Sequence, residues 1–199
     1  MYKRQIEDLA ENASFEEVAY LLLLGKLPTS SELAEFEDEL MNQRTMPDSL
    51  VSVVESIPAS AHPMEVVRTI ISYMGVIEPE KSFDDQLAIA KRLIGVTTTA
   101  IVYWYNFSHN GVKVSQDSGE RSVAGHFLKL LRQEDIPELD KKTLDVSLTL
   151  YAEHEFNAST FTGRVCASTL SDLHSCLTAA VGSLPVSYTH LRAHETHTN

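Results

Sequence analysis

Apolar positions recur along the chain with the spacing of amphipathic helices. In the segment SFEEVAYLLLLGKLP, Ser14 and Glu17 have the spacing of a capping box, and Gly25 ends the pattern. The apolar face of this helix comprises Phe15, Val18, Ala19, Leu22 and Leu23. The next segment, TSSELAEFEDELMNQ, repeats the arrangement with Thr29 and Glu32 as the box. Its apolar stripe comprises Leu33, Phe36 and Leu40.

The remaining segments have the same helical character. A short helix is predicted in PDSLVSVVESIP, a helix beginning at Pro63 in HPMEVVRTIISYMGV, and a long buried helix in FDDQLAIAKRLIGVTTTAIVYWYNF, which ends near the turn-forming pair Asn110-Gly111. Four further helices follow, in SGERSVAGHFLKLLRQ, KKTLDVSLTLYAEH, NASTFTGRVCASTL and SDLHSCLTAAVGSL. No segment shows sustained strand alternation with hairpin signals. The pattern therefore predicts an all-α fold.

Composition limits the class of protein. The chain has 199 residues, of which 43% are hydrophobic and 22% charged, as in ordinary globular proteins with a sizeable core. No repeat or low-complexity linker divides it, so we expect one domain. The formal net charge of −12 argues against nucleic acid as the main partner. The N-terminus MYKRQIEDLAEN lacks the apolar region of a secretory signal, and no apolar run reaches about 18 residues, so we expect a cytoplasmic location and no membrane.

The two cysteines, Cys166 and Cys176, lie ten residues apart and match no CxxC spacing. We expect them to be buried free thiols in a reducing compartment. The helices that contain them are rich in Ala, Ser, Thr and Gly, including Gly163 and Gly182. Such small residues permit close helix packing, either in a core or across a subunit interface.

Several common nucleotide-, hydrolase- and calcium-site patterns are absent from the sequence. It contains no P-loop, GxGxxG, GxSxG or EF-hand pattern. HEFNA, at 154–158, begins like the HExxH helix of zinc proteases, but Ala158 occupies the position of the second ligand. The residues therefore argue against a metalloprotease.

The segment LYAEHEFNASTFTGRV is unusually polar for its apolar surroundings. Buried polar groups need hydrogen-bond partners or a ligand. Either Asn157 or Ser159 caps a helix beside a hydrogen-bonded histidine, or His154 binds an anionic or carbonyl substrate at a helix junction. The residues alone leave both interpretations open.

Four motifs, in order along the chain, resemble the citrate synthase family: IEDLAENASFEEVAYLLLLGKLPTSSEL, PASAHPMEVVRT, SHNG and LYAEHEFNASTFTGRVCASTLSD. The resemblance extends from about Tyr2 to Leu184. VYWYNFSHNG and VAGHFLKLL are more similar to the 2-methylcitrate synthase branch than to a general citrate synthase.

The resemblance implies a mostly helical, homodimeric enzyme that condenses an acyl-CoA with oxaloacetate. In the 2-methylcitrate branch the acyl donor is propionyl-CoA; the alternative is a citrate synthase that uses acetyl-CoA. The family's carboxylate base removes the α-proton, one histidine stabilises the enol, a second assists attack on the oxaloacetate carbonyl, and the thioester is hydrolysed. Closure of a smaller domain excludes water. No metal or other cofactor is implied, since the acyl-CoA is a substrate.

His154 matches the family histidine that contacts oxaloacetate, and it is the one site residue that the resemblance transfers. We expect Asn157 and Arg164, in the same motif, to have capping and packing roles. The resemblance also covers His62, for which a structural role is expected. Three further histidines are expected to be core or surface residues, because they have no partner at metal or triad spacing: His109, His126 and His174.

The chain departs from the family after AAVGSL. The family continues into a GPxHGG loop, whereas here Pro185 is followed by VSYTHLRAHETHTN. We therefore expect residues 1–184 to form the N-terminal part of a citrate-synthase-like large domain, with the small domain absent, and residues 185–199 to form a disordered tail foreign to the family. The second catalytic histidine, the base and the substrate-binding arginines would lie further on, so no catalytic residue is retained. We expect this chain to be inactive alone.

Two alternatives to an inactive enzyme fragment remain at this point. The chain is a non-catalytic helical module that dimerises through its small-residue helices, or its tail binds zinc. In the tail, His190, His194 and His197 fall at helical spacing. Because no apolar face docks these histidines, they have little preorganisation, and we interpret their spacing as coincidental.

Overall fold

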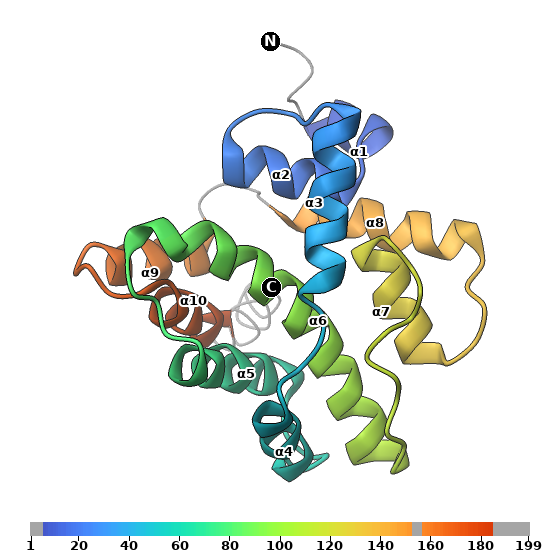
Figure 1. Ribbon diagram of the computed structural model, residues 1–199, viewed down its shortest axis with the longest axis vertical. Helices are drawn as coiled ribbons and strands as arrows, with labels where there is room; N and C mark the ends of the chain where they lie inside the picture. Colours follow the sequence, from blue (N-terminus) through green and yellow to red (C-terminus); the bar gives the residue numbers. More distant parts are fainter. Residues whose placement is uncertain (1–5, 153–156, 185–199) are drawn as a thin grey trace, which may run out of the picture. The chain divides into compact units, whose positions relative to one another are not determined.

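A computed structural model of the chain describes residues 6–152 and 157–184 (Figure 1). Within these ranges the regular elements are all helices, so the all-α prediction is confirmed. They are α1 (Ile6–Asn12), α2 (Phe15–Leu24), α3 (Ser30–Asn42), α4 (Asp48–Ser56), α5 (Pro63–Ile77), the 3-10 helix η2 (Phe83–Asp85), α6 (Gln86–Asn110), α7 (Val123–Arg132), α8 (Glu138–Ala152), α9 (Ala158–Ala167) and α10 (Leu173–Gly182).

The predicted capping boxes are confirmed. At α2 the Ser14 hydroxyl accepts the Glu17 N–H at 3.2 Å, and the Glu17 carboxylate accepts the Ser14 N–H at 2.8 Å. Thr29 and Glu32 make the same reciprocal pair at α3. Gly25 ends α2 with a φ of 76°, in the left-handed region that glycine adopts without strain.

The predicted apolar face of α2 is wrong in part. Val18 and Ala19 are buried, but Leu22 and Leu23 are 51% and 38% exposed. The helix instead buries the side of Glu16, whose carboxylate accepts the Val123 N–H at 2.7 Å. Glu16, which the pattern placed outside the apolar face, therefore lies on the buried side of α2.

The described residues form two compact units. Unit 1 comprises 6–59 and 90–152, and unit 2 comprises 60–89 and 157–184; the boundary near residue 90 lies within α6. The expectation that 1–184 is one domain stays a prediction, and the expected tail, 185–199, lies outside the described residues.

Unit 1 has a core in which α2, α3 and α7 meet. Tyr20 and Phe36 contact edge to face, with ring centroids 5.4 Å apart, and Ala19, Leu40 and Val123 complete the cluster. Close packing of α6 against the end of α3 depends on Gly95. A Cβ there would lie 2.9 Å from the Leu40 carbonyl oxygen, so another residue would clash with backbone.

Unit 2 is built on α10, which packs against both α5 and α9. A Cβ placed on Gly163 of α9 would lie 3.5 Å from the Ala180 Cβ, so the two helices run close together, as their small residues predicted. Leu170, in the connection between them, has a φ of 61°.

One described helical segment, Phe83–Asn110, is long and apolar enough to span a membrane. However, 44% of its most apolar window is buried inside the structure, and a buried core helix passes the same criterion. Val96 and Thr99 in this segment are fully buried.

Candidate functional site

The junction before α9 contains the predicted substrate-binding motif. The Asn157 side-chain oxygen accepts the Ser159 N–H at 2.7 Å and the Thr160 N–H at 3.4 Å, so Asn157 is the N-cap of α9, as predicted. His154 lies outside the described residues, and its contact with oxaloacetate stays a prediction. Arg164 is in the last turn of α9 with an exposed side chain, so the packing role expected of it is not found.

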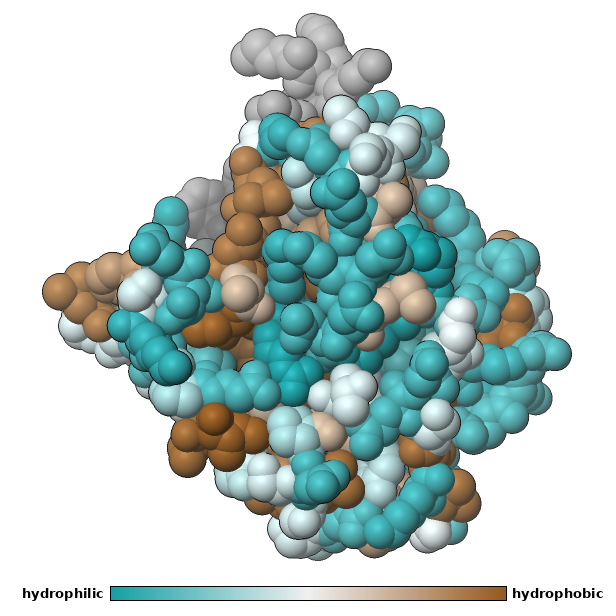
Figure 2. Space-filling model, viewed as in Figure 1, coloured by the Kyte–Doolittle hydropathy of each residue, from teal (hydrophilic) through white to brown (hydrophobic). Residues whose placement is uncertain are grey.

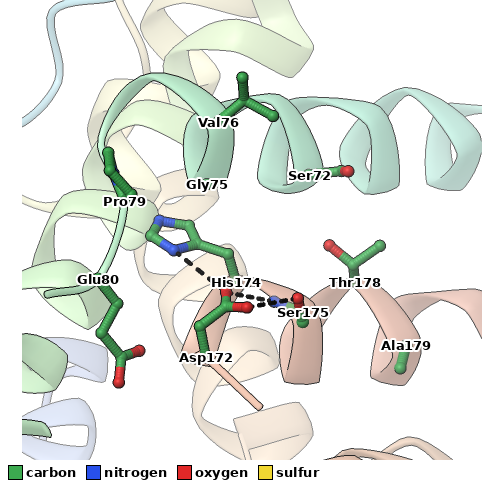
Figure 3. A pocket seen from close by; sticks show the side chains of 10 residues that line it. All are labelled: Ser72, Gly75, Val76, Pro79, Glu80, Asp172, His174, Ser175, Thr178 and Ala179. Atoms are coloured by element: carbon green, nitrogen blue, oxygen red, sulfur yellow. Dashed lines mark hydrogen bonds and ion pairs between the residues drawn. The ribbon is translucent and has the colours of Figure 1, made fainter. Parts of the chain in front are cut away.

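The described residues of unit 2 line a cavity of about 530 Å³ between α5 and α10, which is open to solvent on one side. Figure 3 shows the His174 ring between the last turn of α5 and the Asp172 carboxylate, with Thr178 reaching from α10 toward α5. Ser72 and Val76 line the cavity from the α5 side. The cavity therefore has a mixed polar and apolar wall.

His174 is buried but incompletely paired. Its side chain is 3% exposed, and its Nδ1 has no hydrogen-bond partner; the nearest charge is the Asp172 Oδ1, 3.8 Å away. Burial lowers its pKa, against the opposing attraction of Asp172. The imidazole is thus neutral near neutral pH, and one ring nitrogen is open to a further hydrogen bond.

Carboxylates occupy the N-terminus of α10 beside this cavity. Asp172 accepts the Ser175 N–H at 2.9 Å as the N-cap, and Glu80 accepts the Leu173 N–H at 2.6 Å. Because these amides are already hydrogen-bonded to carboxylates, the helix N-terminus does not attract a substrate carboxylate.

A second cavity, of about 570 Å³, lies in unit 1 beside the start of α7. Its basic side chains are paired: Lys141 with Glu120 at 2.9 Å, Arg121 with Glu37 at 3.1 Å, and Lys142 with Asp145 at 3.9 Å. These pairs neutralise the cations that an anionic substrate would need.

Three other histidines have structural roles, as expected: His62, His109 and His126. The Nδ1 of His62 accepts the Met64 N–H at 3.2 Å and caps α5. The ring of His109 contacts Tyr105 and Trp104 near the end of α6.

His126 is completely buried, and each of its ring nitrogens has a hydroxyl partner: Thr99 at 2.9 Å and Ser118 at 2.8 Å. Burial, and next the Arg44 charge, lower its pKa to about 3, so it is a neutral core residue.

Sequence reasoning missed the unpaired nitrogen of His174 and the reciprocal cap at His62. The second had a signal, since Glu65 stands three residues after His62 and Pro63 between them suits a first helical position. The unpaired nitrogen of His174 had no such signal, because the residues that bury this histidine belong to α5, which is far away in sequence. No group of three or more His, Cys, Asp or Glu suited to a metal ion occurs among residues 6–152 and 157–184.

Comparison with known proteins identifies the family. The family described as "Citrate synthase, C-terminal domain" matches residues 2–196. The chain is 54% identical over 179 residues to the 2-methylcitrate synthase of Shewanella oneidensis, covering 90% of this chain and 48% of that protein. It is 37% identical over 182 residues to the citrate synthase of Deinococcus radiodurans, with the same coverage.

Solved structures agree. The chain matches Thermoplasma acidophilum citrate synthase, solved as a ternary complex with carboxymethyl coenzyme A and oxaloacetate. The TM-score is 0.81 and the identity 27%, over 90% of this chain and 48% of that one. The chain thus spans about half the length of the curated relatives it matches. Its helices have the citrate-synthase fold over that half, and the chain belongs to the citrate synthase family.

Proposed function

We propose that the protein to which this chain corresponds condenses an acyl-CoA with oxaloacetate and hydrolyses the resulting thioester. The observation that carries this is the family match over nearly the whole chain, together with relatives named as synthases of citrate and 2-methylcitrate. The reaction must stabilise an enolate-like charge, which needs donors fixed before the charge forms. The enzyme class is an acyltransferase that converts the acyl group to an alkyl group on transfer.

Within this half of the enzyme, His154 is the residue that we assign to oxaloacetate. The support is its place in the family motif and the cap that follows it. Asn157 fixes the backbone at the start of α9 with two hydrogen bonds, three residues after His154.

Propionyl-CoA is the acyl donor that we favour, which would place the enzyme in propionate breakdown. The identity to the Shewanella 2-methylcitrate synthase, 54%, exceeds the 37% identity to the Deinococcus citrate synthase over a similar length. Acetyl-CoA, the donor of the tricarboxylic acid cycle, is the alternative.

A chimera tests the condensation activity and the role of His154. Residues 1–184 would replace the matching half of the Shewanella 2-methylcitrate synthase, and CoA release would be followed with oxaloacetate plus propionyl-CoA or acetyl-CoA. We expect turnover, with propionyl-CoA preferred, and a loss of about 100-fold or more in His154→Ala. An inactive but folded chimera contradicts the condensation function. If His154→Ala matches a surface control such as Glu35→Ala, the assignment of His154 fails.

We expect the 199-residue chain alone to give no CoA release above a no-enzyme control. The residues proposed for proton abstraction and enol stabilisation belong to the half that the chain does not match. No cofactor is proposed, since acyl-CoA is a substrate. Turnover by the isolated chain would contradict this expectation.

A homodimer is the proposed assembly, with unit 2 contributing to its interface. Phe161 and Val165, one turn apart on α9, are 71% and 51% exposed, and Figure 2 shows apolar surface over this helix. Exposed apolar surface on small-residue helices is typical of subunit interfaces. We propose a cytoplasmic location, with neither membrane nor nucleic acid as partner.

Sizing of the chain at several concentrations tests the dimer. A dimer that Phe161→Glu converts to a monomer supports it, and a monomer at every concentration contradicts it. If the chain dimerises while the chimera is folded and inactive, the alternative of a non-catalytic dimerisation module is favoured.

A further inference from the structure

The two cysteines of unit 2 lie on the same helix–helix seam. Gly163 of α9 packs against Ala180 and the Cys176 carbonyl of α10, with a Cβ there 3.5 and 3.6 Å from these groups. The five residues between α9 and α10 make a short hairpin connection, so the helices run antiparallel. Cys166 lies one turn after Gly163 on α9. Cys176 lies one turn before Ala180 on α10. The two side chains therefore face each other.

The two thiols interact and differ in exposure. The Cys176 Sγ donates to the Ser171 carbonyl oxygen at 3.6 Å, and Cys166 is close enough to raise the pKa of Cys176. Cys176 is buried, whereas Cys166 is half-buried. The pKa of the Cys176 thiol is raised to about 11, first by burial and then by the hydrogen bond to Cys166. Both cysteines are free thiols in this structure, as the sequence predicted, although only Cys176 is buried.

The connection that joins the two helices holds the pair together. Leu170 adopts a left-handed φ of 61°, and the Thr169 hydroxyl donates to the Cys166 carbonyl at 2.7 Å. The Leu170 N–H donates to the Ala167 carbonyl at 2.9 Å, and the Thr169 N–H donates to the Cys166 carbonyl at 3.1 Å. The geometry of the hairpin is thus set independently of any bond between the sulfurs.

We propose that Cys166 and Cys176 are a reversible dithiol–disulfide pair, which low-molecular-weight disulfides such as glutathione disulfide oxidise to an intrachain bond that joins α9 to α10. A metal-binding role has less support, because no third metal-ligating side chain joins the two thiols among the described residues.

The exchange proceeds in two balanced steps. The Cys166 thiolate attacks one sulfur of the small disulfide, whose S–S bond breaks to release one small thiolate and leave a mixed disulfide on Cys166. The Cys176 thiolate then attacks the Cys166 sulfur, and the second small thiolate leaves. The protein loses two hydrogen atoms, and the oxidant takes up two electrons and two protons as two thiols. Cys166, the more accessible of the two thiols, is the entry point, and the second step is slow near neutral pH because little of the Cys176 thiol is ionised.

Mass spectrometry of the 199-residue chain tests the pair. The folded chain would be incubated with glutathione and glutathione disulfide, quenched with N-ethylmaleimide and digested with trypsin. Both cysteines fall within one tryptic peptide, 165–192, because no Lys or Arg lies between Arg164 and Arg192. We expect this peptide to lack two hydrogen atoms and carry no maleimide, and to recover two maleimides after reduction by dithiothreitol.

Two matched variants assign the steps. In the Cys176→Ser variant, the mixed disulfide with glutathione should accumulate on Cys166. In the Cys166→Ser variant, the buried Cys176 should react with glutathione disulfide at least about tenfold more slowly than Cys166 does in the first variant. Circular dichroism checks that both variants are folded. The same chain unfolded in urea gives the reference, and we expect the native chain to form the bond at a glutathione disulfide fraction at least about tenfold lower.

Three results would overturn the proposal: native and unfolded chains that oxidise equally, a product held at the mixed disulfide in the wild-type chain, or bonds only between two chains on a non-reducing gel. The outcome does not depend on the condensation activity, since no substrate is present.

Discussion

The two units bury a histidine each, and the two environments differ. In unit 1, His126 has a hydroxyl on both ring nitrogens and sits in a closed core. In unit 2, His174 is almost as buried, yet its Nδ1 has no hydrogen-bond partner and its ring lines a cavity. A completed polar network specifies one arrangement, whereas an open one leaves room for rearrangement or for a further partner. We therefore expect unit 1 to resist change more strongly than unit 2.

Two glycine substitutions give the largest expected difference between the units. Gly95→Ala in unit 1 would place a Cβ 2.9 Å from backbone atoms of Leu40 and Gln43, which cannot move away. Gly75→Ala in unit 2 would place one 2.8 Å from the Cβ of His174, a side chain beside a cavity. We expect losses in the free energy of unfolding of about 3 and about 1 kcal/mol.

Urea unfolding of the chain, followed by circular dichroism, measures both losses. Gly163→Ala is the control, since its Cβ makes ordinary contacts at 3.5 Å and the change should be neutral or stabilising. Equal losses at Gly95 and Gly75 would remove the contrast between the units.

Acid should destabilise unit 1 through His126. The pKa of His126 is lowered to about 3 in the folded chain, from an ordinary value of 6.5. Between pH 3 and pH 6.5 the unfolded state therefore binds the proton more readily than the folded state does. Stability from the neutral imidazole is therefore present above pH 6.5 and is lost as the pH falls toward 3. The loss between pH 7 and pH 5 should be about 2 kcal/mol, measured as the difference between wild type and His126→Gln.

The same measurement on His174→Gln should give a smaller loss. Burial lowers the pKa of His174 too, but the carboxylates of Asp172, Glu80 and Glu78 oppose the shift by favouring the imidazolium. An equal or larger pH dependence at His174 would show that the open environment in unit 2 excludes charge as well as the closed one does.

The cap of α9 should also make a small contribution to stability. Asn157→Ala removes the acceptor of the Ser159 and Thr160 amides and should cost about 1 kcal/mol, whereas Asn157→Asp should keep the cap. The same substitution in the active chimera tests whether the cap positions His154. If it does, Asn157→Ala should also raise the KM of the chimera for oxaloacetate. An unchanged KM would limit Asn157 to a structural role.

Local features of the fold were predictable because their causes lie within a few residues. Ser14 with Glu17 marked a helix start, and Gly25 its end. The buried face of α2 was predicted wrongly in part: Glu16 lies on it and accepts a hydrogen bond from the Val123 amide, more than a hundred residues away. A prediction from periodicity puts a carboxylate such as that of Glu16 on the solvent-exposed side of its helix, because the sequence does not show the distant partner that lets it be buried.

The site was less predictable for the same reason. The cap by Asn157 follows from local spacing and is confirmed. The role of His154 came from resemblance to a family and stays a prediction. The open nitrogen of His174 depends on packing between α10 and α5, which no pattern within either helix records.

Unit 2 is built from two segments that are far apart in sequence, and this affects how the chain folds while it is being translated. Helix α5 ends at Ile77, and its partner α10 begins at Leu173. At typical translation rates the ribosome needs roughly 5–20 s to make the residues between them. During that time the face of α5 that carries Gly75, which packs against His174 of α10 in the finished chain, has no α10 to cover it. The packing of α10 on α5 can therefore form only after α6, α7, α8 and α9 have been made, so unit 2 stays incomplete while the segments of unit 1 are already available to fold.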